Sequence, residues 1–377
     1  MKKKYIVIGI TIILLTVIVT TIVIRKNNQK HIMHNGVMLA IMLDGEKITS
    51  FPERGSYNIE IDCGDTANGI WLAEEWKLAV EKINGNVTCN IEFKSNPTTL
   101  KSKVETVNAS QNYDGNGYRY SGKTPNNWVW FNGEKWRIIG SIPICTSSGC
   151  ATKENLVKII RSESIGTYVY DAKSSGYTGT WGSNTLYSLL NTSYYATSRA
   201  AMNGQNHAGC YSHYNSSYQS RPNCDYTEIG ILSSSYYGQM VKNVYWNTGA
   251  SSNSVTASTA YTNETASRTV LGYVGLMSAS DWGYAASSSY HSILMNSYTS
   301  SSNNATENSW IFNNGYEWTS IRISSDTTIA LGVSILGTMG GNYANNGYAV
   351  RPVVYLDSSV YIVSGDGTES NPYQIGM

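Results

Sequence analysis

The sequence predicts an α+β protein of more than one domain. Apolar and polar residues alternate in segments 57–63 (YNIEIDC) and 87–93 (VTCNIEF), as in strands with one buried face. Apolar residues recur three and four positions apart in segments 186–194 and 229–244, each behind residues that can cap a helix. A chain of 377 residues is too long for one average domain. We therefore expect strands and helices in two folded units.

An uncharged run from Tyr5 to Ile24 precedes both units. A helix of about 20 residues suffices to cross a bilayer, and the run has that length. A cleaved signal peptide would have a shorter apolar stretch and a small-residue cleavage site, whereas this run ends in Ile24-Arg25-Lys26. We therefore expect residues 1–27 to be an uncleaved signal anchor, with residues 5–24 in contact with cytoplasmic-membrane lipid. Basic residues on both flanks determine its orientation only weakly.

Cysteine usage and charge indicate where the bulk of the chain lies. The six cysteines fall in three pairs close in sequence, Cys63/Cys89, Cys145/Cys150 and Cys210/Cys224. An even, locally paired set fits an oxidising exterior, so we expect three disulfides and a single-pass membrane protein whose C-terminal bulk is extracellular. A net charge of +1 with 14% charged residues argues against binding to nucleic acid, which needs a clustered basic face.

One cysteine pair admits a second interpretation. His207, Cys210, His213 and Cys224 have spacings that a zinc site can use. The interval after His213 is long for a zinc finger, and a disulfide is simpler outside the cell. We therefore predict no metal site, and we predict no cofactor.

Residues 28–105 are expected to form a small all-β, sandwich-like domain that acts as a stalk or spacer. Cys63 and Cys89 each fall on the apolar face of their own strand, where facing strands can bring the two sulfurs together. Asp44-Gly45 between apolar runs predicts a two-residue hairpin turn. Segment 71–80 has features of both strand and helix. A second adhesive module is the alternative for this domain.

The region from residue 112 onward begins with a predicted aromatic hairpin. Trp128, Trp130 and Trp136 flank the turn dipeptide Asn132-Gly133, and LVKIIR (156–161) follows as a third strand. Helix 186–194 begins behind Ser183 and Asn184, and helix 229–244 behind Thr227. Gly230 and Gly238 weaken the second helix.

The order of several segments resembles bacterial surface-protein domains with a C-type lectin-like fold. These segments are NNWVWFNGEKWRIIG, VKIIRSESIG, GLMSASDWGYA, WTSI and GYAVRPVVYL followed by SGDGTESNPYQI. Such domains are similar, at a distance, to formylglycine-generating enzymes and to ligand-binding proteins diversified by retroelements. The resemblance covers residues 112–377 and implies an antiparallel core with long irregular loops on one side. Formylglycine-generating enzymes work through a pair of cysteines in the catalytic region, and here no cysteine follows Cys224.

Loop composition favours ligand recognition over catalysis. Tyr, Ser, Gly and Asn, the residues favoured in antibody binding loops, dominate residues 247–348. We expect an anchored extracellular protein, not an enzyme, that binds a glycan or a protein. The candidate ligand-binding residues are Asp281, Trp282, Tyr284, Trp318, Asn342, Tyr343, Asn345, Asn346 and Tyr348. The alternatives are an architectural envelope protein without a specific ligand, and an enzyme that is formylglycine-generating-like or acts on glycans.

Two of these segments also have a purely structural interpretation. Asp281 is either an acid beside an exposed Trp282 or a helix-capping residue beside a core tryptophan. In the closing segment, Val350, Pro352, Val354 and Leu356 are expected to face the core, and Arg351 to form a structural ion pair or to cap backbone carbonyls. Asn342 to Tyr348 would then be the loop that this strand displays.

Overall fold

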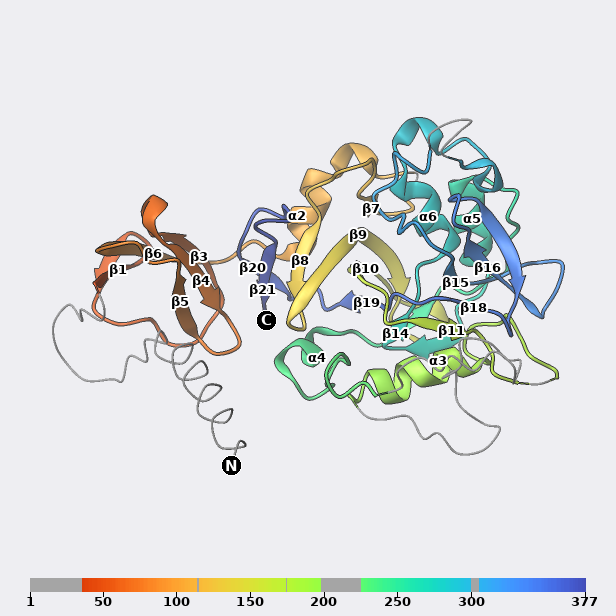
Figure 1. The fold of residues 1–377 in the computed structure, drawn as a ribbon, viewed down its shortest axis with the longest axis horizontal. Helices are drawn as coiled ribbons and strands as arrows, with labels where there is room; N and C mark the ends of the chain where they lie inside the picture. Colours follow the sequence, from red (N-terminus) through yellow and green to blue (C-terminus); the bar gives the residue numbers. More distant parts are fainter. Residues whose placement is uncertain (1–35, 114, 174, 198–224, 300–304) are drawn as a thin grey trace, which may run out of the picture. The chain divides into compact units, whose positions relative to one another are not determined.

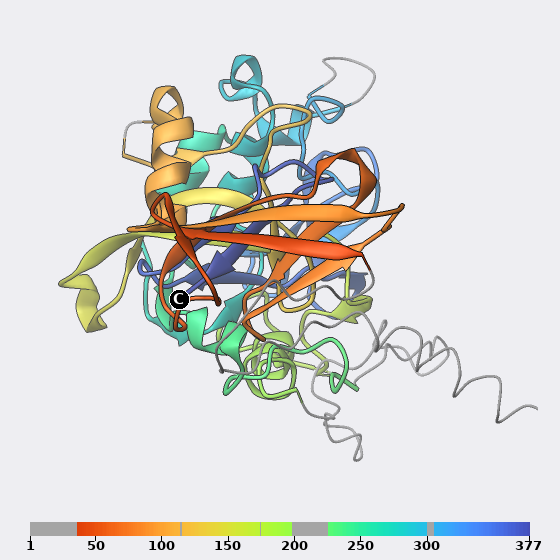
Figure 2. The same cartoon turned by 90° about the vertical axis from the view of Figure 1, so that its left-hand side faces the viewer.

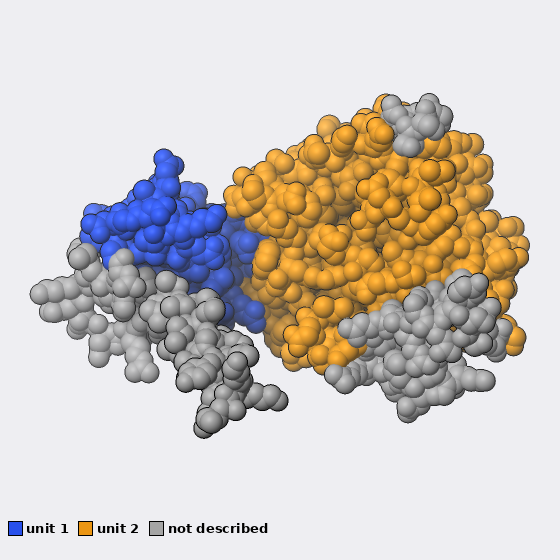
Figure 3. Space-filling view, viewed as in Figure 1, with its two compact units in different colours: residues 1–98, 361–365, 373–377 blue, residues 99–360, 366–372 orange. Residues whose placement is uncertain are grey.

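The computed structural model describes residues 36–113, 115–173, 175–197, 225–299 and 305–377. It is a mixed protein of helices and many strands (Figure 1). Two compact units are coloured separately in Figure 3. Within the described ranges, no helix is long and apolar enough to cross a membrane. The expected anchor, residues 1–27, lies outside those ranges, as do Cys210, Cys224 and the two histidines of the zinc interpretation.

Unit 1 comprises described residues 36–98, 361–365 and 373–377. Its four-stranded sheet has the order β2-β1-β6-β3, with β1 and β6 parallel and β3 antiparallel to β6. These are the red and orange strands that run side by side in Figure 2. Two hairpins, β4–β5 and β20–β21, complete the unit. The strands are β1 (Val37–Leu43), β2 (Glu46–Ile48), β3 (Tyr57–Asp62), β4 (Asn68–Leu72), β5 (Lys77–Glu81), β6 (Val87–Ser95), β20 (Tyr361–Ser364) and β21 (Tyr373–Gly376).

The local predictions for unit 1 are confirmed. Cys63 and Cys89 form a disulfide with an S–S distance of 2.02 Å, and both residues lie in the core. Asp44 and Gly45, with φ of 50° and 85°, form the turn between β1 and β2. Both residues of this turn type require positive φ, which Asp tolerates and Gly adopts freely. The ambiguous segment 71–80 belongs to the β4–β5 hairpin.

The boundaries of unit 1 differ from the expected division into 28–105 and 112–377. Residues from Thr99 onward belong to unit 2, including α2 (Leu100–Val107). At the other end of the chain, the hairpin β20–β21 belongs to unit 1. Its residues Tyr361 and Val363 are part of the unit 1 core, 6% and 2% exposed. Strand periodicity predicts that such a segment has a buried face, but it does not indicate which core buries it.

Unit 2 contains two sheets. One runs β14-β19-β10-β9-β8, with β7, β12 and β13 alongside, and the other runs β11-β18-β15-β16-β17. The strands are β7 (Tyr118–Arg119), β8 (Trp128–Phe131), β9 (Glu134–Cys145), β10 (Lys153–Arg161), β11 (Thr167–Val169), β12 (Val244–Trp246), β13 (Val270–Gly272), β14 (Val274–Gly275), β15 (Glu317–Arg322), β16 (Ile329–Val333), β17 (Met339–Tyr343), β18 (Gly347–Ala349) and β19 (Val353–Leu356).

Helices of unit 2 lie on two sides of the first sheet. In Figure 1, α3 and α4 are below the strands β9, β10 and β19, while α5 and α6 are above and to the right. The helices after α2 are α3 (Thr185–Leu189), which continues as a π-helical turn over Leu190–Tyr194, α4 (Tyr236–Met240), α5 (Ala257–Glu264) and α6 (Ala279–Ala285). α5 and α6 pack against each other.

Most of the local predictions for unit 2 are confirmed. β8 and β9 form the aromatic hairpin around Asn132 and Gly133, whose φ values of 55° and 78° suit a two-residue turn. β10 is the expected third strand, and Cys145 is bonded to Cys150. Helix α3 begins at its predicted cap, where the Asn184 side chain accepts a hydrogen bond from the Tyr187 backbone N–H.

The helix expected over 229–244 is wrong for most of its length. Only α4 (Tyr236–Met240) is helical, and Val244 already begins β12. A Cβ on Gly238 would lie 2.1 Å from the carbonyl oxygen of Leu232, and one on Gly230 would lie 2.4 Å from that of Tyr194. These glycines allow backbone segments to approach closely, so the apolar spacing belongs to a compact, turn-rich segment.

The closing strand β19 is buried, and its neighbouring arginine is ion-paired. Val350, Val354 and Leu356 are completely buried. Arg351 binds Glu317 through two contacts, Nε to Oε1 at 2.7 Å and a terminal nitrogen to Oε2 at 2.8 Å. The structural role predicted for Arg351 is therefore confirmed.

Candidate functional site

The nine candidate ligand-binding residues divide into a buried set and a partly exposed set. Asp281, Trp282, Tyr284 and Trp318 are only 1–2% exposed. Trp282 is thus not the exposed tryptophan of the ligand interpretation, because every residue of α6 is buried. Asn342, Tyr343, Asn345, Asn346 and Tyr348 lie on β17, on β18 and in the turn between them, and each keeps some exposure.

Asp281 is the helix-capping residue of α6. Its carboxylate oxygen Oδ2 accepts a hydrogen bond from the Ser278 backbone N–H at 2.8 Å. The Ser278 hydroxyl in turn accepts one from the Asp281 N–H at 3.2 Å. This reciprocal pair is a capping box, which satisfies two backbone donors at the start of the helix.

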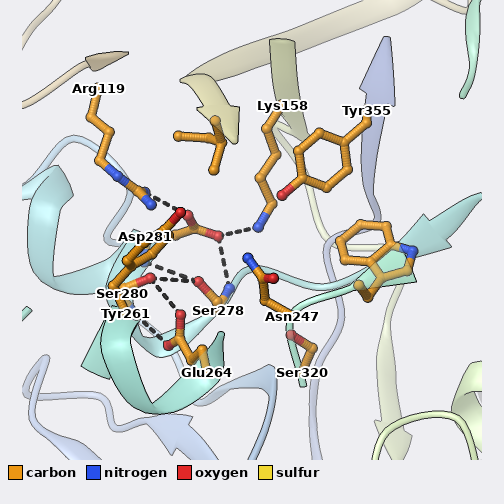
Figure 4. A pocket seen from close by; sticks show the side chains of 12 residues that line it. Arg119, Lys158, Asn247, Tyr261, Glu264, Ser278, Ser280, Asp281, Ser320 and Tyr355 are labelled. Carbon is orange, nitrogen blue, oxygen red and sulfur yellow. Dashed lines mark hydrogen bonds and ion pairs between the residues drawn. The ribbon is translucent and has the colours of Figure 1, made fainter. Parts of the chain in front are cut away.

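Two buried cations bind the same carboxylate (Figure 4). Arg119 of β7 donates to Asp281 Oδ1 at 2.7 Å, and Lys158 of β10 donates to Oδ2. Burial alone would raise the pKa of Asp281, but the charges of Lys158 and Arg119 outweigh it and lower the pKa to about 2. Asp281 is therefore ionised at neutral pH and joins α6 to two strands.

In Figure 4, Ser278 and Ser280 lie between Asp281 and Glu264. Glu264 is 1% exposed. It accepts hydrogen bonds from the Ser280 backbone N–H at 2.8 Å and from the Ser280 hydroxyl at 2.6 Å. The hydroxyls of Ser280 and Ser278 are 3.0 Å apart, so a short polar chain connects Glu264 to the cap of α6. Burial raises the pKa of Glu264 to about 7, and the charge of Asp281 acts in the same direction.

Two carboxyl groups with widely separated pKa values are typical of acid–base catalysis. Here, however, the space beside them that a water centre can occupy is about 10 Å³, which is room for about one water molecule. A sugar or peptide substrate cannot reach either carboxyl group in this conformation. In the described part of the chain, no three His, Cys, Asp or Glu side chains come together as metal ligands. The arrangement is best described as a buried ionic cluster that joins α5 and α6 to β7 and β10.

Three members of this cluster are absent from the sequence-based candidates. Lys158 had a detectable signal, since a charged residue interrupts the apolar run LVKIIR. Arg119 lies between two tyrosines, and Glu264 lies in a polar stretch, so neither stands out. Only the packing of α5 against α6 brings Glu264 to Ser280.

Tyr348, one of the partly exposed candidates, belongs to a second feature, which we call the aromatic surface and define by Tyr316, Trp318 and Tyr348. The Tyr348 ring stacks on buried Trp318, with ring centroids 4.3 Å apart, and contacts Tyr316 at 4.9 Å. Tyr316 and Tyr343 are 45% and 51% exposed. The aromatic surface therefore has a buried indole, a phenol ring stacked on it and a half-exposed phenol ring at its edge, whereas the Tyr343 ring contacts Tyr177, with centroids 6.3 Å apart.

A glycine of β16 and the amide side chains of β17 and the β17–β18 turn hold the Tyr348 ring in place. A Cβ on Gly332 would lie 2.8 Å from the Tyr348 ring, so only glycine leaves room for that ring on β16. The Asn342 side chain interacts with the Tyr348 hydroxyl and accepts a hydrogen bond from Asn346 Nδ2 at 2.6 Å. Burial raises the pKa of Tyr348, so its hydroxyl stays protonated and can donate at neutral pH.

Glu264 is expected to make the stability of unit 2 depend on pH. Its folded pKa of about 7 lies above the ordinary value of 4.5, so the folded state binds this proton more tightly than the unfolded state does. The resulting stabilisation is complete below 4.5 and is lost as the pH rises through about 7. The expected loss is on the order of 3 kcal/mol.

The measurement is denaturant unfolding of wild type and Glu264→Gln across this pH range. The variant keeps an oxygen that can accept from the Ser280 N–H but cannot ionise, so its free energy of unfolding should lack this fall. Asp281, whose pKa is about 2, titrates below this pH range and does not contribute to the fall. His291, whose pKa is lowered by burial, contributes equally to both proteins. Equal slopes in the two proteins would contradict the prediction.

No family model matches this chain, and no curated protein or solved structure does.

Proposed function

We propose that this is a membrane-anchored extracellular bacterial protein that recognises a glycan or protein ligand through the aromatic surface of unit 2 and through Tyr343 of β17. The observation that carries the proposal is the half-exposed ring of Tyr316 beside the stacked rings of Tyr348 and Trp318. Tyrosine offers a large contact area and a polar tip, and a ring already held by stacking loses little conformational entropy on binding.

Two further observations support this proposal. The disulfides Cys63–Cys89 and Cys145–Cys150 suit an oxidising exterior. The largely antiparallel sheets of unit 2, connected by long irregular segments, are compatible with a C-type lectin-like fold, which we propose for this unit. An enzyme acting on glycans finds less support, because Asp281 and Glu264 are enclosed.

The proposal is tested by presenting the full chain, in lipid nanodiscs, to glycan and peptide arrays and to cell surfaces. Tyr316→Ala and Tyr343→Ala are each expected to weaken binding of the best ligand by about five- to thirtyfold, because a contact tyrosine at a binding hot spot is worth about 1–2 kcal/mol. The residue exchanged in each variant is half-exposed, so folding should be unaffected.

Leu271→Ala is the matched control, since Leu271 is 43% exposed on β13 of the same unit. It should bind as wild type does. If no ligand is found, or if both tyrosine variants bind as tightly as the control, the architectural alternative replaces this proposal.

A further inference from the structure

Arg137 of β9 is clamped between two indole rings. The centre of its guanidinium is 4.1 Å from the ring centroid of Trp128 and 4.8 Å from that of Trp310. Its Nε donates to the side-chain oxygen of Asn127 at 2.6 Å. Two indole rings and one side-chain oxygen therefore contact the guanidinium.

The other edge of this guanidinium has no hydrogen-bond partner in the described part of the chain. Arg119, Arg161 and Arg351 of the same unit each bind a carboxylate, those of Asp281, Glu134 and Glu317. Among the described residues, by contrast, no carboxylate forms an ion pair with Arg137, and its two terminal nitrogens donate to no atom. These nitrogens are not sealed from solvent.

The clamp holds the guanidinium in one orientation. Asn127 is completely buried, and its Nδ2 donates to the carbonyl oxygen of Ile138 at 2.8 Å. The Trp310 indole N–H donates to the carbonyl oxygen of Tyr120 at 2.8 Å. Since both supports are themselves fixed, little entropy remains to be lost when a ligand binds the free edge. Two parallel N–H donors on a planar fork match the two oxygens of a carboxylate.

Among the described residues, the charge of Arg137 has no paired carboxylate, although Glu369 lies near enough to favour the charged form. Burial lowers the pKa of Arg137 to about 10, and the positive charge of Arg351 acts in the same direction. Arg351 is itself neutralised by Glu317. A bound anion would supply Arg137 with the counter-charge that the neighbouring arginines obtain from the protein.

We propose that Arg137, held between Trp128 and Trp310, is a binding site for a carboxylate group of a ligand, which its two terminal nitrogens contact in a bidentate pair. The carboxylate can come from an acidic sugar or from a peptide C-terminus. This inference goes beyond the proposed function and uses no residue of the aromatic surface, so the two can fail separately.

The test titrates the full chain in nanodiscs with glucuronate, N-acetylglycine and acetate at constant ionic strength, with glucose as the neutral control. The Arg137 Nε–Hε resonance should shift with each carboxylate and not with glucose. A single exposed bidentate pair is expected to bind in the millimolar range, with a Kd of about 1 mM. The tighter of glucuronate and N-acetylglycine identifies the source of the carboxylate.

Arg137→Gln is expected to weaken this binding by about tenfold or more, since a charge-assisted hydrogen bond contributes about 1.5–3 kcal/mol. Arg137→Lys keeps the charge but loses the fork, and it should also bind more weakly than wild type. Arg268→Gln is the matched control, because Arg268 Nε likewise donates to an asparagine oxygen, that of Asn247 at 3.0 Å. It should bind as wild type does.

Two results would overturn the proposal. The first is that none of the carboxylates shifts the Arg137 Nε–Hε resonance of the wild-type protein. This measurement does not depend on the folding of any variant. The second is that Arg268→Gln loses as much affinity as Arg137→Gln. The carboxylates would then respond to the positive charge of the protein in general and not to a site at Arg137.

Discussion

Asp281→Ala is expected to lower the free energy of unfolding of unit 2 by about 3–5 kcal/mol, because it leaves two cations buried without their counter-charge. Arg119 and Lys158 are 1% and 3% exposed, so neither can turn to water without moving the sheet around it. The change also removes the capping box of α6. Denaturant unfolding followed by tryptophan fluorescence gives the difference from wild type.

The control for Asp281→Ala is an exposed ion pair of the same unit. Glu369 lies 3.9 Å from Lys135, with side chains 66% and 39% exposed. Glu369→Ala should change stability by less than about 1 kcal/mol, because water screens such pairs. Asp281→Asn, which can keep the cap but not the charge, should fall between the two variants. An Asp281→Ala protein as stable as the Glu369→Ala protein would show that the cluster does not hold unit 2 together.

Features set by neighbouring residues were predictable from the sequence. The turns at Asp44-Gly45 and Asn132-Gly133 need residues that adopt positive φ, and those residues stand beside each other in the chain. The Cys63–Cys89 disulfide follows from the period of two in its strands, which places both sulfurs on the buried face. Cap residues such as Asn184 act within one helical turn.

Features set by distant residues were not predictable. Asp281 lies 162 positions from Arg119 and 123 from Lys158, so no local pattern indicates that the three meet. Trp282 was a candidate contact because aromatic residues serve both in cores and in binding sites. Which role Trp282 has depends on what packs against α6. In the structure Trp282 is a core residue, because α6 is buried. Glu264 has a perturbed pKa only because the fold buries it.

Unit 1 is built from both ends of the described chain. Tyr361→Ala is expected to destabilise this unit by about 3–5 kcal/mol, because it removes a large buried ring from the core. The Tyr361 hydroxyl also donates to the carbonyl oxygen of Gly55 at 3.1 Å. A unit this small is only marginally stable, so a loss of this size approaches its whole stability. Hydrogen exchange of the β3 and β6 amides should then rise toward that of unfolded chain.

Met377→Ala is the control, since Met377 is 46% exposed in the same C-terminal stretch and its loss should leave exchange in β3 and β6 unchanged. Protection of these amides that stays equal in Tyr361→Ala and Met377→Ala would mean that segment 36–98 folds without the hairpin. If the β20–β21 hairpin is required, unit 1 cannot complete its core until the chain of unit 2 has been synthesised. The long insertion adds only modestly to the cost, because loop-closure entropy grows with the logarithm of loop length. Unit 1 should then fold after unit 2 even though its first strands leave the ribosome first.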